Sequence, residues 1–228
     1  MQPNDSSRLK PSRRDHAYHP LRLITRALQE EGARGLLGPV VDLGCGARPY
    51  ASLLPTPYLG LDAHHLHGDP DVVALAEAVP MRSGFAGTVL STQQLEHVDD
   101  PAAVVVEARR ILQPGGRLLL STHGVWAHHP DPNDLWRWTE EGLTRLITEA
   151  GFDVERTHRL GGPVLAGTLL ASYPLSGAAR NRRGVIRTTA RSALAMMNAV
   201  VWPVDQAVER RAPRHYGSVG YLVSAIAR

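Results

Sequence analysis

A glycine turn directly after a short apolar run is the first feature of the sequence with a clear chemical use. Val40–Leu43 predicts a buried strand, and Gly44, Cys45 and Gly46 follow it at once. Because glycine lacks a Cβ atom and tolerates positive φ, the backbone of such a turn can approach a ligand closely. Asp62 ends the next apolar run, where a carboxylate can accept hydrogen bonds from ribose hydroxyls. Together these features predict a site for a nucleotide-type cofactor.

Histidine and acidic side chains follow two later apolar runs that also predict strands. Gln93, Glu96 and His97 come after the first of these runs, and His123 comes after the second. Histidine is the usual base for removing a proton from an alcohol, because its pKa lies near neutrality. We therefore predict His123 as the catalytic base, with His97 as the second candidate. The alternative for His97 is structural, since its side chain could orient the loop ahead of the next helix.

The segment after His123 is rich in aromatic and cationic side chains and is the predicted wall for a substrate. An indole face and a guanidinium suit stacking on a sugar or aromatic ring and pairing with a carboxylate or phosphate. The predicted substrate-binding residues are Trp126, His128, Trp136, Arg137 and Trp138. The alternative is that one of the tryptophans packs the following helix onto the sheet.

The pair His128-His129 lies close in sequence to Asp131 and Asp134, and such residues suit several divalent ions. Intervening prolines stiffen this loop, and no histidine pair has the i, i+4 spacing of a helical metal site. We therefore predict no metal site here, and expect a loop that walls the acceptor pocket instead.

The order of apolar runs and helical patterns predicts the elements that hold these residues. Strands are expected over 40–43, 58–62, 72–75, 88–91, 117–121, 152–158 and 218–227, and helices over about 16–37, 101–112 and 139–150. Asp100 and Pro101 suit a helix start, because aspartate caps free N–H groups and proline fits the first helical position. Strands that alternate with helices predict an α/β fold, a doubly wound parallel sheet with helices on both faces. Ligands of such sheets bind beyond the carboxyl ends of the strands, where the candidate residues stand.

Three stretches of the sequence together resemble a known enzyme family. VVDLGCGARPY resembles the first motif of class I S-adenosylmethionine-dependent methyltransferases, and YLGLDA resembles their second. The run from AEAVPMRSGF to ILQPGGRLLLST is similar to a subgroup that often acts on small molecules and on envelope or natural-product glycans. The resemblance covers about residues 36–160. It implies a Rossmann-like sheet, mostly parallel with a last antiparallel strand, and S-adenosylmethionine as cofactor.

The resemblance also implies roles for the residues of the cofactor site. Gly44 and Gly46 would line the methionine part of S-adenosylmethionine. Asp62 would bind the ribose hydroxyls, and Ala63 would flank the adenine. The predicted cofactor-binding residues are Asp42, Gly44, Cys45, Gly46, Asp62, Ala63, Ala76 and Gln93.

The sequence departs from the family pattern at three positions. Arg48 stands where a third glycine is common, within an Arg-Pro-Tyr variant that the subgroup also shows. Leu75 stands where an acid usually contacts the adenine amine, and Gly87 replaces a frequent aspartate. We therefore expect the backbone of Ala76 and apolar packing to hold the adenine.

Residues 161–212 break the alternation of strands and helices. Two apolar stretches flank five arginines with no acid among them: Arg180, Arg182, Arg183, Arg187 and Arg191. We predict a helical insertion within a methyltransferase domain of residues 16–160 and 213–228, preceded by a disordered arm over 1–15. The insertion could cover the active site as a lid, form a homodimer contact, or lie on a membrane with its arginines towards anionic headgroups. All three uses remain open from the sequence.

Composition indicates a globular protein with unevenly distributed charge. The 228 residues are 43% hydrophobic, which suffices for a buried core. Residues 156–228 hold 11 arginines against two acids, whereas residues 1–155 hold 14 Lys and Arg against 20 Asp and Glu. A polyanionic neighbour could bind the basic part. Nucleic acid is not predicted, because the basic segment lacks the interleaved aromatic residues used for base stacking.

Cysteine content and hydropathy give an expected location. Cys45 is the only cysteine, which excludes an internal disulfide framework and a cysteine-based zinc site. The polar, basic start shows no apolar core of a secretory signal, and no stretch has the roughly 18 apolar residues of a membrane span. We expect a cytoplasmic protein, with peripheral membrane contact through 161–212 as the open alternative.

The resemblance implies a methyltransferase that acts on an oxygen of a small molecule, a sugar or a lipid-linked glycan. One rival is a catalytically silent protein that binds S-adenosylmethionine or acts as a scaffold. The departures from the family pattern at Leu75 and Gly87 support this rival. A weaker rival is a NAD-type oxidoreductase. The incomplete glycine fingerprint and the ILQPGG turn speak against that rival.

Overall fold

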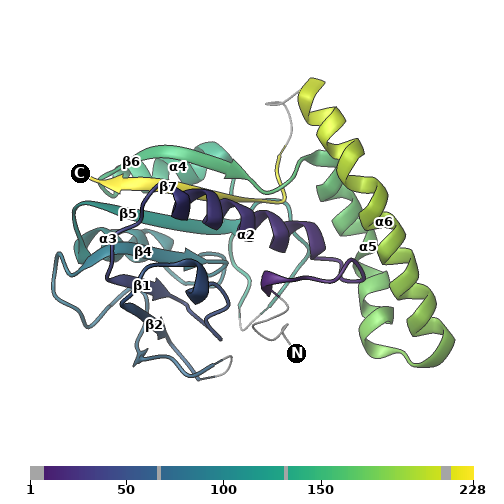
Figure 1. Cartoon of the computed structure of the whole chain (residues 1–228), viewed down its shortest axis with the longest axis horizontal. Coiled ribbons are helices and arrows are strands. Elements are labelled where there is room, and N and C mark those ends of the chain that lie inside the picture. The colour runs from purple at the N-terminus through teal and green to yellow at the C-terminus, as the bar shows by residue number, and fades with distance from the viewer. Residues whose placement is uncertain (1–7, 66–67, 131–132, 212–216) are drawn as a thin grey trace.

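The computed structural model describes residues 8–65, 68–130, 133–211 and 217–228. A seven-stranded sheet has helices on both faces, and a pair of helices projects from one end of it (Figure 1). The strands are β1 (Val40–Leu43), β2 (Tyr58–Asp62), β3 (Val72–Val73), β4 (Ala86–Thr92), β5 (Leu112–His123), β6 (Phe152–Arg159) and β7 (Gly220–Ala227). The helices are α2 (Tyr18–Ala33), the 3-10 helix η1 (Ala51–Leu53), α3 (Pro101–Ile111), α4 (Glu140–Glu149), α5 (Pro163–Asn181) and α6 (Gly184–Arg211).

The strand order is β3-β2-β1-β4-β5-β7-β6, and only β7 runs against its neighbours. This confirms the predicted α/β class, a mostly parallel Rossmann-like sheet with a last antiparallel strand. Leu43 at the end of β1 is level with Leu61 of β2 and Ser91 of β4. The carboxyl ends of the parallel strands therefore meet at one edge, where ligands of such sheets bind.

Successive residues of each central strand pack on opposite faces of the sheet, as a strand requires. Val40, Leu90 and Leu119 contact the buried side of α2 in one cluster. Their sequence neighbours Val41 and Val89 belong to a second cluster, which holds the buried residues of α3 and α4. Each such leucine or valine contributes about 1.5–3 kcal/mol by leaving water. The two clusters hold the strands as a rigid base for the edge where they end.

The start of α3 agrees with the sequence prediction, whereas the end of α2 differs from it. Asp100 accepts hydrogen bonds from the backbone N–H groups of Ala102 and Ala103, both at 3.0 Å, and α3 begins at the predicted place. Helix α2 ends at Ala33, short of the expected residue 37. Gly35 takes a φ of +89°, the left-handed conformation with which glycine commonly ends a helix.

The third strand is shorter and the fifth longer than predicted. β3 is an edge strand of two residues that pairs with β2 alone, and Leu75, expected in it, is exposed. β5 begins at Leu112, because the Gln-Pro-Gly-Gly segment that ends α3 is already extended. Its far end reaches His123, which places this residue at the carboxyl edge of the sheet.

Helices α5 and α6 lie between β6 and β7 in the chain and form the projecting pair, with α6 on the outside (Figure 1). Asp205 of α6 is buried and accepts hydrogen bonds from the backbone N–H groups of Gly162 and Leu165, at 2.7 and 2.9 Å. This carboxylate fixes α6 to the start of α5. Within the described residues, no helix combines the length and the apolar character needed to cross a membrane.

The N-terminal segment differs in part from the predicted arm over residues 1–15. Residues 1–7 lie outside the described residues. The amide of Asn198 on α6 donates to the carbonyl oxygens of Arg13 and Asp15, at 2.8 and 2.9 Å, and Leu9 packs against the α2 cluster. Residues 8–15 are therefore bound to the body of the protein and to α6. The sequence pattern missed this, because the partner lies 183 residues or more away.

Candidate functional site

The glycine turn and Asp62 lie together at the carboxyl ends of β1 and β2, as the sequence predicts. Gly44 and Gly46 both take positive φ, +70° and +49°. One carboxylate oxygen of Asp62 accepts from the Gly46 N–H at 3.0 Å, and the other accepts from the His64 N–H at 3.2 Å. Each oxygen keeps a second lone pair, so the carboxylate can still accept hydroxyl hydrogen bonds.

Asp42 lies beneath this turn and has an unsatisfied oxygen. The Tyr58 hydroxyl donates to its Oδ2 at 2.5 Å, whereas Oδ1 is buried and has no hydrogen-bond partner. Burial raises the pKa of Asp42 to about 7, and the Asp62 charge adds to the rise. Burial also raises the pKa of the Cys45 thiol to about 12, so that this cysteine stays protonated.

Arg48, where the family often has a third glycine, binds the segment that follows β2. Its φ is +56°, and its guanidinium lies 3.0 Å from a carboxylate oxygen of Asp71 and donates to the carbonyl of Asp69. The backbone of Gly68 then touches the turn, since a Cβ there would come within 2.3 Å of the Gly46 oxygen. An arginine at this position therefore anchors a loop beside the glycine turn.

Of the other two departures from the family pattern, the one at Gly87 has a steric cause in the fold. Gly87 lies against the backbone of the segment before β1, where a Cβ would approach the Leu37 and Gly38 oxygens to 2.7 Å. No side chain, including aspartate, fits there without movement. Leu75 is exposed and Ala76 is buried next to it, at the end of β3. The predicted role of the Ala76 backbone towards adenine, like that of Ala63, remains a prediction.

Gln93 and Gln94 follow β4 at the same edge. Gln93 takes a φ of +53°, and its N–H and side-chain amide both donate to Ser121 of β5. Gln94 was not predicted as a site residue, yet its side chain lies on the glycine turn. A Cβ on Gly44 would come within 2.6 Å of its Cγ. Glycine is thus required at position 44 by side-chain packing as well as by positive φ.

These residues fit S-adenosylmethionine. The glycine turn has the backbone conformation that admits a ligand, and the Asp62 carboxylate beside it can accept from ribose hydroxyls. The orphaned Oδ1 of Asp42 needs a donor, and the cofactor carries an ammonium group at its methionine end. Asp42, Gly44, Gly46 and Asp62 would therefore hold it.

His123 ends β5 and faces Glu96, from the loop after β4. Its Nδ1 lies 3.1 Å from the Glu96 Oε1, and both side chains are buried. The other oxygen of Glu96 accepts from the Thr122 hydroxyl at 2.8 Å. Glu96 was placed near the site by sequence but was given no role. Its position directly before His97, in a loop that returns to the end of β5, is the signal that could have found it.

Burial shifts the pKa of both members of this pair towards the uncharged form. It lowers the pKa of His123 well below the ordinary value of 6.5, and the positive Arg137 nearby lowers it further. It raises the pKa of Glu96 above 4.5. His123 is consequently a neutral imidazole at neutral pH, which is the form that a general base requires.

Three segments of the chain form an aromatic wall around His123. The Trp126 ring stacks on His123, with ring centroids 4.3 Å apart and planes at 8°. His16, from the N-terminal segment, and Tyr173, from α5, lie edge to face at 5.8 Å, and His16 also contacts Trp126 at 6.3 Å. Burial and the nearby Arg180 lower the pKa of His16 to about 4, so it too is neutral.

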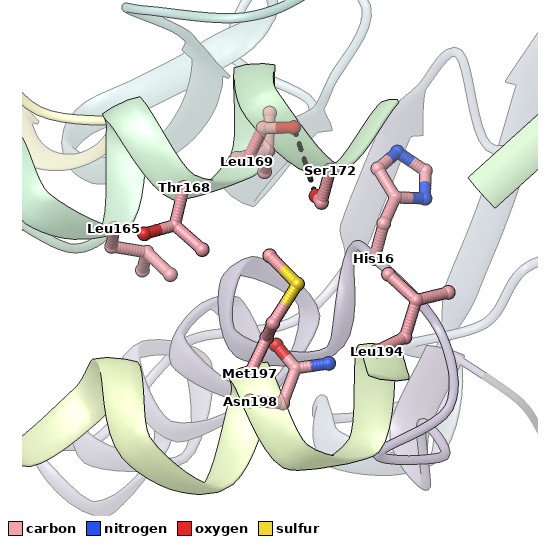
Figure 2. A pocket seen from close by; sticks show the side chains of 8 residues that line it. All are labelled: His16, Leu165, Thr168, Leu169, Ser172, Leu194, Met197 and Asn198. Atoms are coloured by element: carbon pink, nitrogen blue, oxygen red, sulfur yellow. Dashed lines mark hydrogen bonds between the residues drawn. The ribbon is translucent and has the colours of Figure 1, made fainter. Parts of the chain in front are cut away.

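His16 also borders a small cavity between the two projecting helices (Figure 2). The side chains of Leu165 and Leu169 on α5 and of Met197 on α6 line it, and the Ser172 hydroxyl is turned back to the Leu169 carbonyl. Neither His16 nor Tyr173 was predicted as a site residue. Both come from segments far from His123 in sequence, so no local pattern indicated them.

His97 and His128 lie in the same loop cluster, and the rings of both His97 and His123 lie near His129, with centroids 5.9 and 6.3 Å from it. The Nδ1 of His97 is 2.5 Å from the Asn133 carbonyl oxygen, a contact that supports the structural alternative for this residue. His128 is mostly exposed and faces Asp134 at 3.2 Å. In the described part of the chain, no group of three or more His, Cys, Asp or Glu side chains could hold a metal ion.

Arg137 is engaged within its own loop. All five of its N–H groups donate. Two donate to the Asp134 carboxylate, and the other three donate to the carbonyl oxygens of Trp126, Ala127 and Trp136. This guanidinium lowers the pKa of Asp134 well below its usual value. It is therefore a clamp that shapes the loop, with no donor left for the substrate carboxylate or phosphate that the sequence suggested.

The two remaining tryptophans of the predicted substrate wall have structural contacts within the protein. The Trp136 indole donates to the Val98 carbonyl at 2.9 Å, and Trp138 packs against the cluster that holds Leu143 of α4. Trp138 thus packs the following helix onto the sheet, which was the stated alternative. Of the five predicted substrate-binding residues, Trp126 is the one whose ring stacks on His123. Trp138 contacts His123 through its backbone N–H, which donates to the His123 carbonyl at 3.0 Å.

Comparisons with known proteins agree with this geometry. A family described as a methyltransferase domain matches residues 12–157. The ubiquinone biosynthesis O-methyltransferase of Dinoroseobacter shibae is 30% identical over 181 residues, which cover 60% of this chain and 73% of the relative. The enzyme of the same name from Cereibacter sphaeroides is 28% identical over 217 residues, 76% of this chain and 86% of the relative. The crystal structure of the [4+2]-cyclase SpnF shares the fold, with a TM-score of 0.58 and 16% identity, over 89% of this chain and 81% of that one.

Proposed function

The chain belongs to the class I S-adenosylmethionine-dependent methyltransferases, and we propose that it methylates a hydroxyl group of a small molecule, a sugar or a lipid-linked glycan. The observation that carries this proposal is the neutral His123, held against Glu96 at the carboxyl edge of the sheet. A base is needed when the acceptor must lose a proton, as an alcohol does. The two relatives described above are named O-methyltransferases, which supports an oxygen acceptor.

The cofactor supplies a methyl group on a positively charged sulfur. The backbone of Gly44 and Gly46 and the carboxylates of Asp42 and Asp62 would hold it, and Gln94 packs against the glycine turn from the other side. Holding both reactants in line supplies much of the acceleration for a transfer of this kind. The rigid strand ends keep these residues in place.

His123 then takes the acceptor's hydroxyl proton on Nε2, while its Nδ1 faces the Glu96 carboxylate. The oxygen electron pair freed by this step would accept the methyl group that the bound cofactor supplies. Glu96 stabilises the imidazolium that forms and is itself held by the Thr122 hydroxyl. Glu96 is thus a positioning residue, and His123 is the proposed catalytic residue.

The wall of Trp126, His16 and Tyr173 suits an acceptor with a ring. Aromatic faces attract sugar and aromatic rings by stacking and by burial of apolar surface. His16 and His123 are neutral, so their imidazoles offer hydrogen bonds to such a ring without a charge of their own. A hydroxylated ring therefore suits this wall.

Transfer of a labelled methyl group tests the proposal without knowledge of the acceptor. The protein is incubated with methyl-tritiated S-adenosylmethionine and bacterial extract, split into lipid and water-soluble fractions. We expect label in one fraction that resists mild alkali, because a methyl ether survives alkali and a methyl ester does not. A protein that binds S-adenosylhomocysteine but labels nothing would be the silent scaffold instead. Label found on nitrogen by NMR would overturn the oxygen assignment.

The sequence left two partners open for residues 161–212, a peripheral membrane contact and a homodimer, and we propose the membrane contact. The five arginines of this segment make no ion pair with another described residue, which favours an anionic surface over a second copy of the same basic segment. Sedimentation velocity without lipid measures the oligomeric state. A monomer is the expected result. Nucleic acid is not part of the proposal.

A further inference from the structure

Exposed apolar side chains concentrate on α5 and α6. Of the 14 large hydrophobic residues that are exposed in the described part of the chain, seven lie on these two helices. They are Leu170, Tyr173, Val185, Ile186, Met196, Val200 and Val204. Soluble surfaces scatter such residues singly, and a contiguous apolar face usually marks an interaction site. The two helices therefore present a surface that the fold itself does not cover.

On α6 the exposed residues form a row. Val185, Met196, Val200 and Val204 follow spacings of 11, 4 and 4 residues, which place them on one face of a helix. They are 80, 72, 63 and 45% exposed. A different face of the same helix carries the buried residues, Ala190, Leu194, Asn198, Val201 and Asp205. One face of α6 is therefore buried in the protein, and a second face exposes apolar side chains to solvent, where a surface helix normally carries polar ones.

Arginines bracket this row at both ends. Arg182 and Arg183 precede α6, and Arg210 and Arg211 end it, all with exposed side chains. Arg211 follows Val204 by seven residues and so lies on the same helix face. None of these four arginines forms an ion pair with another described residue. Their charge is therefore not balanced by any acid in the described part of the chain.

We propose that the outer face of α6 is a docking surface for an anionic lipid bilayer. We call it the α6 surface and define it by Arg182, Arg183, Met196, Val200, Val204, Arg210 and Arg211. Its apolar row enters the boundary between headgroups and acyl chains, and the arginines at its ends bind lipid phosphates. An interfacial helix of this kind lies in the membrane plane. It needs no spanning segment, and none is found among the described residues.

Charge complementarity favours an anionic bilayer over a second copy of the chain as the partner of the α6 surface. Residues 156–228 hold 11 arginines and two acids, so a second copy would bring two strongly basic segments together. Like charges at close range oppose such a contact, whereas an anionic leaflet attracts each arginine near it. The 28 residues of α6 extend over about 42 Å, and the apolar residues Met196 to Val204 span about 12 Å of that length between the flanking arginines.

Docking would bring the reaction site close to the lipid surface. α5 packs along α6, and its Tyr173 lies in the aromatic wall beside His16 while remaining partly exposed. Trp126, which stacks on His123, packs against the cluster that holds Leu165 of α5 and Val201 of α6. A lipid-linked acceptor could reach His123 from the bilayer. This consequence rests on the proposed function, whereas the docking itself does not.

Vesicle sedimentation tests the α6 surface. Sucrose-loaded vesicles of phosphatidylglycerol and phosphatidylcholine are compared with vesicles of phosphatidylcholine alone, at about 0.1 M salt. We expect the protein to sediment with the anionic vesicles only. Changing Arg182, Arg183, Arg210 and Arg211 to Gln should raise the lipid concentration for half binding at least about tenfold, because four attractive charges are lost. The double variant Met196→Ser/Val200→Ser should weaken binding about as much, through the lost apolar insertion.

A matched control removes the same amount of charge elsewhere. Arg14, Arg26, Arg82 and Arg145 are exposed and lie outside the projecting helices, and their change to Gln should leave vesicle binding within about twofold. Loss of binding in this control, or no binding by the unaltered protein, would overturn the proposal. A lipid-free dimer that Met196→Ser/Val200→Ser dissociates would show that a second copy covers the surface. Calorimetry with S-adenosylhomocysteine on every variant keeps a failure of docking distinct from a failure of the proposed function.

Discussion

The Nδ1 atom of His123 and the Oε1 atom of Glu96 lie 3.1 Å apart in the core, yet neither has a well-aligned hydrogen bond. The two residues come from the ends of adjacent strands, β5 and the loop after β4, and are 27 positions apart in sequence. Burial disfavours charge on both. A proton taken up by His123 therefore needs the Glu96 carboxylate beside it to offset the cost of a buried positive charge.

Replacing Glu96 with Gln should lower kcat about tenfold to a hundredfold and shift the acid limb of the pH–rate profile to lower pH. In the unaltered protein, His123 can donate Nδ1–H to a carboxylate only above the raised pKa of Glu96. Activity should therefore rise with pH through that pKa. Gln offers an uncharged acceptor at every pH, which leaves the low pKa of His123 to set the limb. The measurement is kcat against pH for methyl transfer.

A Glu96→Gln profile that keeps its acid limb at the original pH would remove Glu96 from the proton path. Thr122→Val serves as the companion variant, because it removes the hydroxyl that holds the other carboxylate oxygen but leaves the charge. It should raise the pKa of Glu96 and move the limb to higher pH, the direction opposite to that of Glu96→Gln.

Asp62→Ala should weaken binding of S-adenosylhomocysteine at least about tenfold, because it removes the carboxylate beside the glycine turn. A tenfold weaker affinity corresponds to a loss of about 1.4 kcal/mol of binding free energy. Isothermal titration calorimetry gives the dissociation constant directly. Asp153→Ala is the control, because this exposed carboxylate begins β6 at the opposite edge of the sheet. Equal affinity in Asp62→Ala and the unaltered protein would contradict the placement of the cofactor.

Tyr58→Phe should reduce the free energy of unfolding by about 1–3 kcal/mol, with the larger loss at pH 8 than at pH 5. The folded pKa of Asp42, about 7, exceeds the unfolded value of 3.8, so the folded state binds more protons between those values and stability falls as pH rises through them. At pH 8 the buried carboxylate is charged and needs the Tyr58 hydroxyl most. Urea unfolding at the two pH values measures the difference.

Asp42→Asn supplies the control for that prediction. The amide carries no charge at any pH, so the loss caused by Tyr58→Phe in this background should be the same at pH 5 and pH 8. A loss that is equal at both pH values in the original background as well would mean that Asp42 is not the titrating partner.

The sheet and the cofactor side of the site could be predicted because their signals are local. Gly44, Gly46 and Asp62 follow strands within one short stretch, and a parallel sheet necessarily brings strand ends together. Asp100 caps its helix through neighbours two and three residues away, so its role is visible in sequence. The departures at Arg48 and Gly87 were visible too, but their reasons were not. Each depends on a backbone approach from a separate segment.

The acceptor side could not be predicted to the same depth, because its contacts are long-range. Arg137 has the residue type of a substrate anchor, and only the structure shows that Asp134 and three carbonyls already occupy its donors. His16 reaches the wall because Asn198 holds the preceding segment, a contact across most of the chain. Residue type indicates what a side chain can do, and the fold decides whether it is free to do it.

The most direct test of the account is methyl transfer by His123→Gln, measured with tritiated S-adenosylmethionine and the acceptor fraction that the unaltered protein labels. Gln matches the polar reach of histidine but cannot take a proton, so the rate should fall about 10²- to 10⁴-fold. The affinity for S-adenosylhomocysteine should stay within about twofold, because the cofactor residues lie on other strand ends. A variant that binds S-adenosylhomocysteine normally and still transfers methyl groups within about threefold of the original rate would contradict the assignment of His123 as the base.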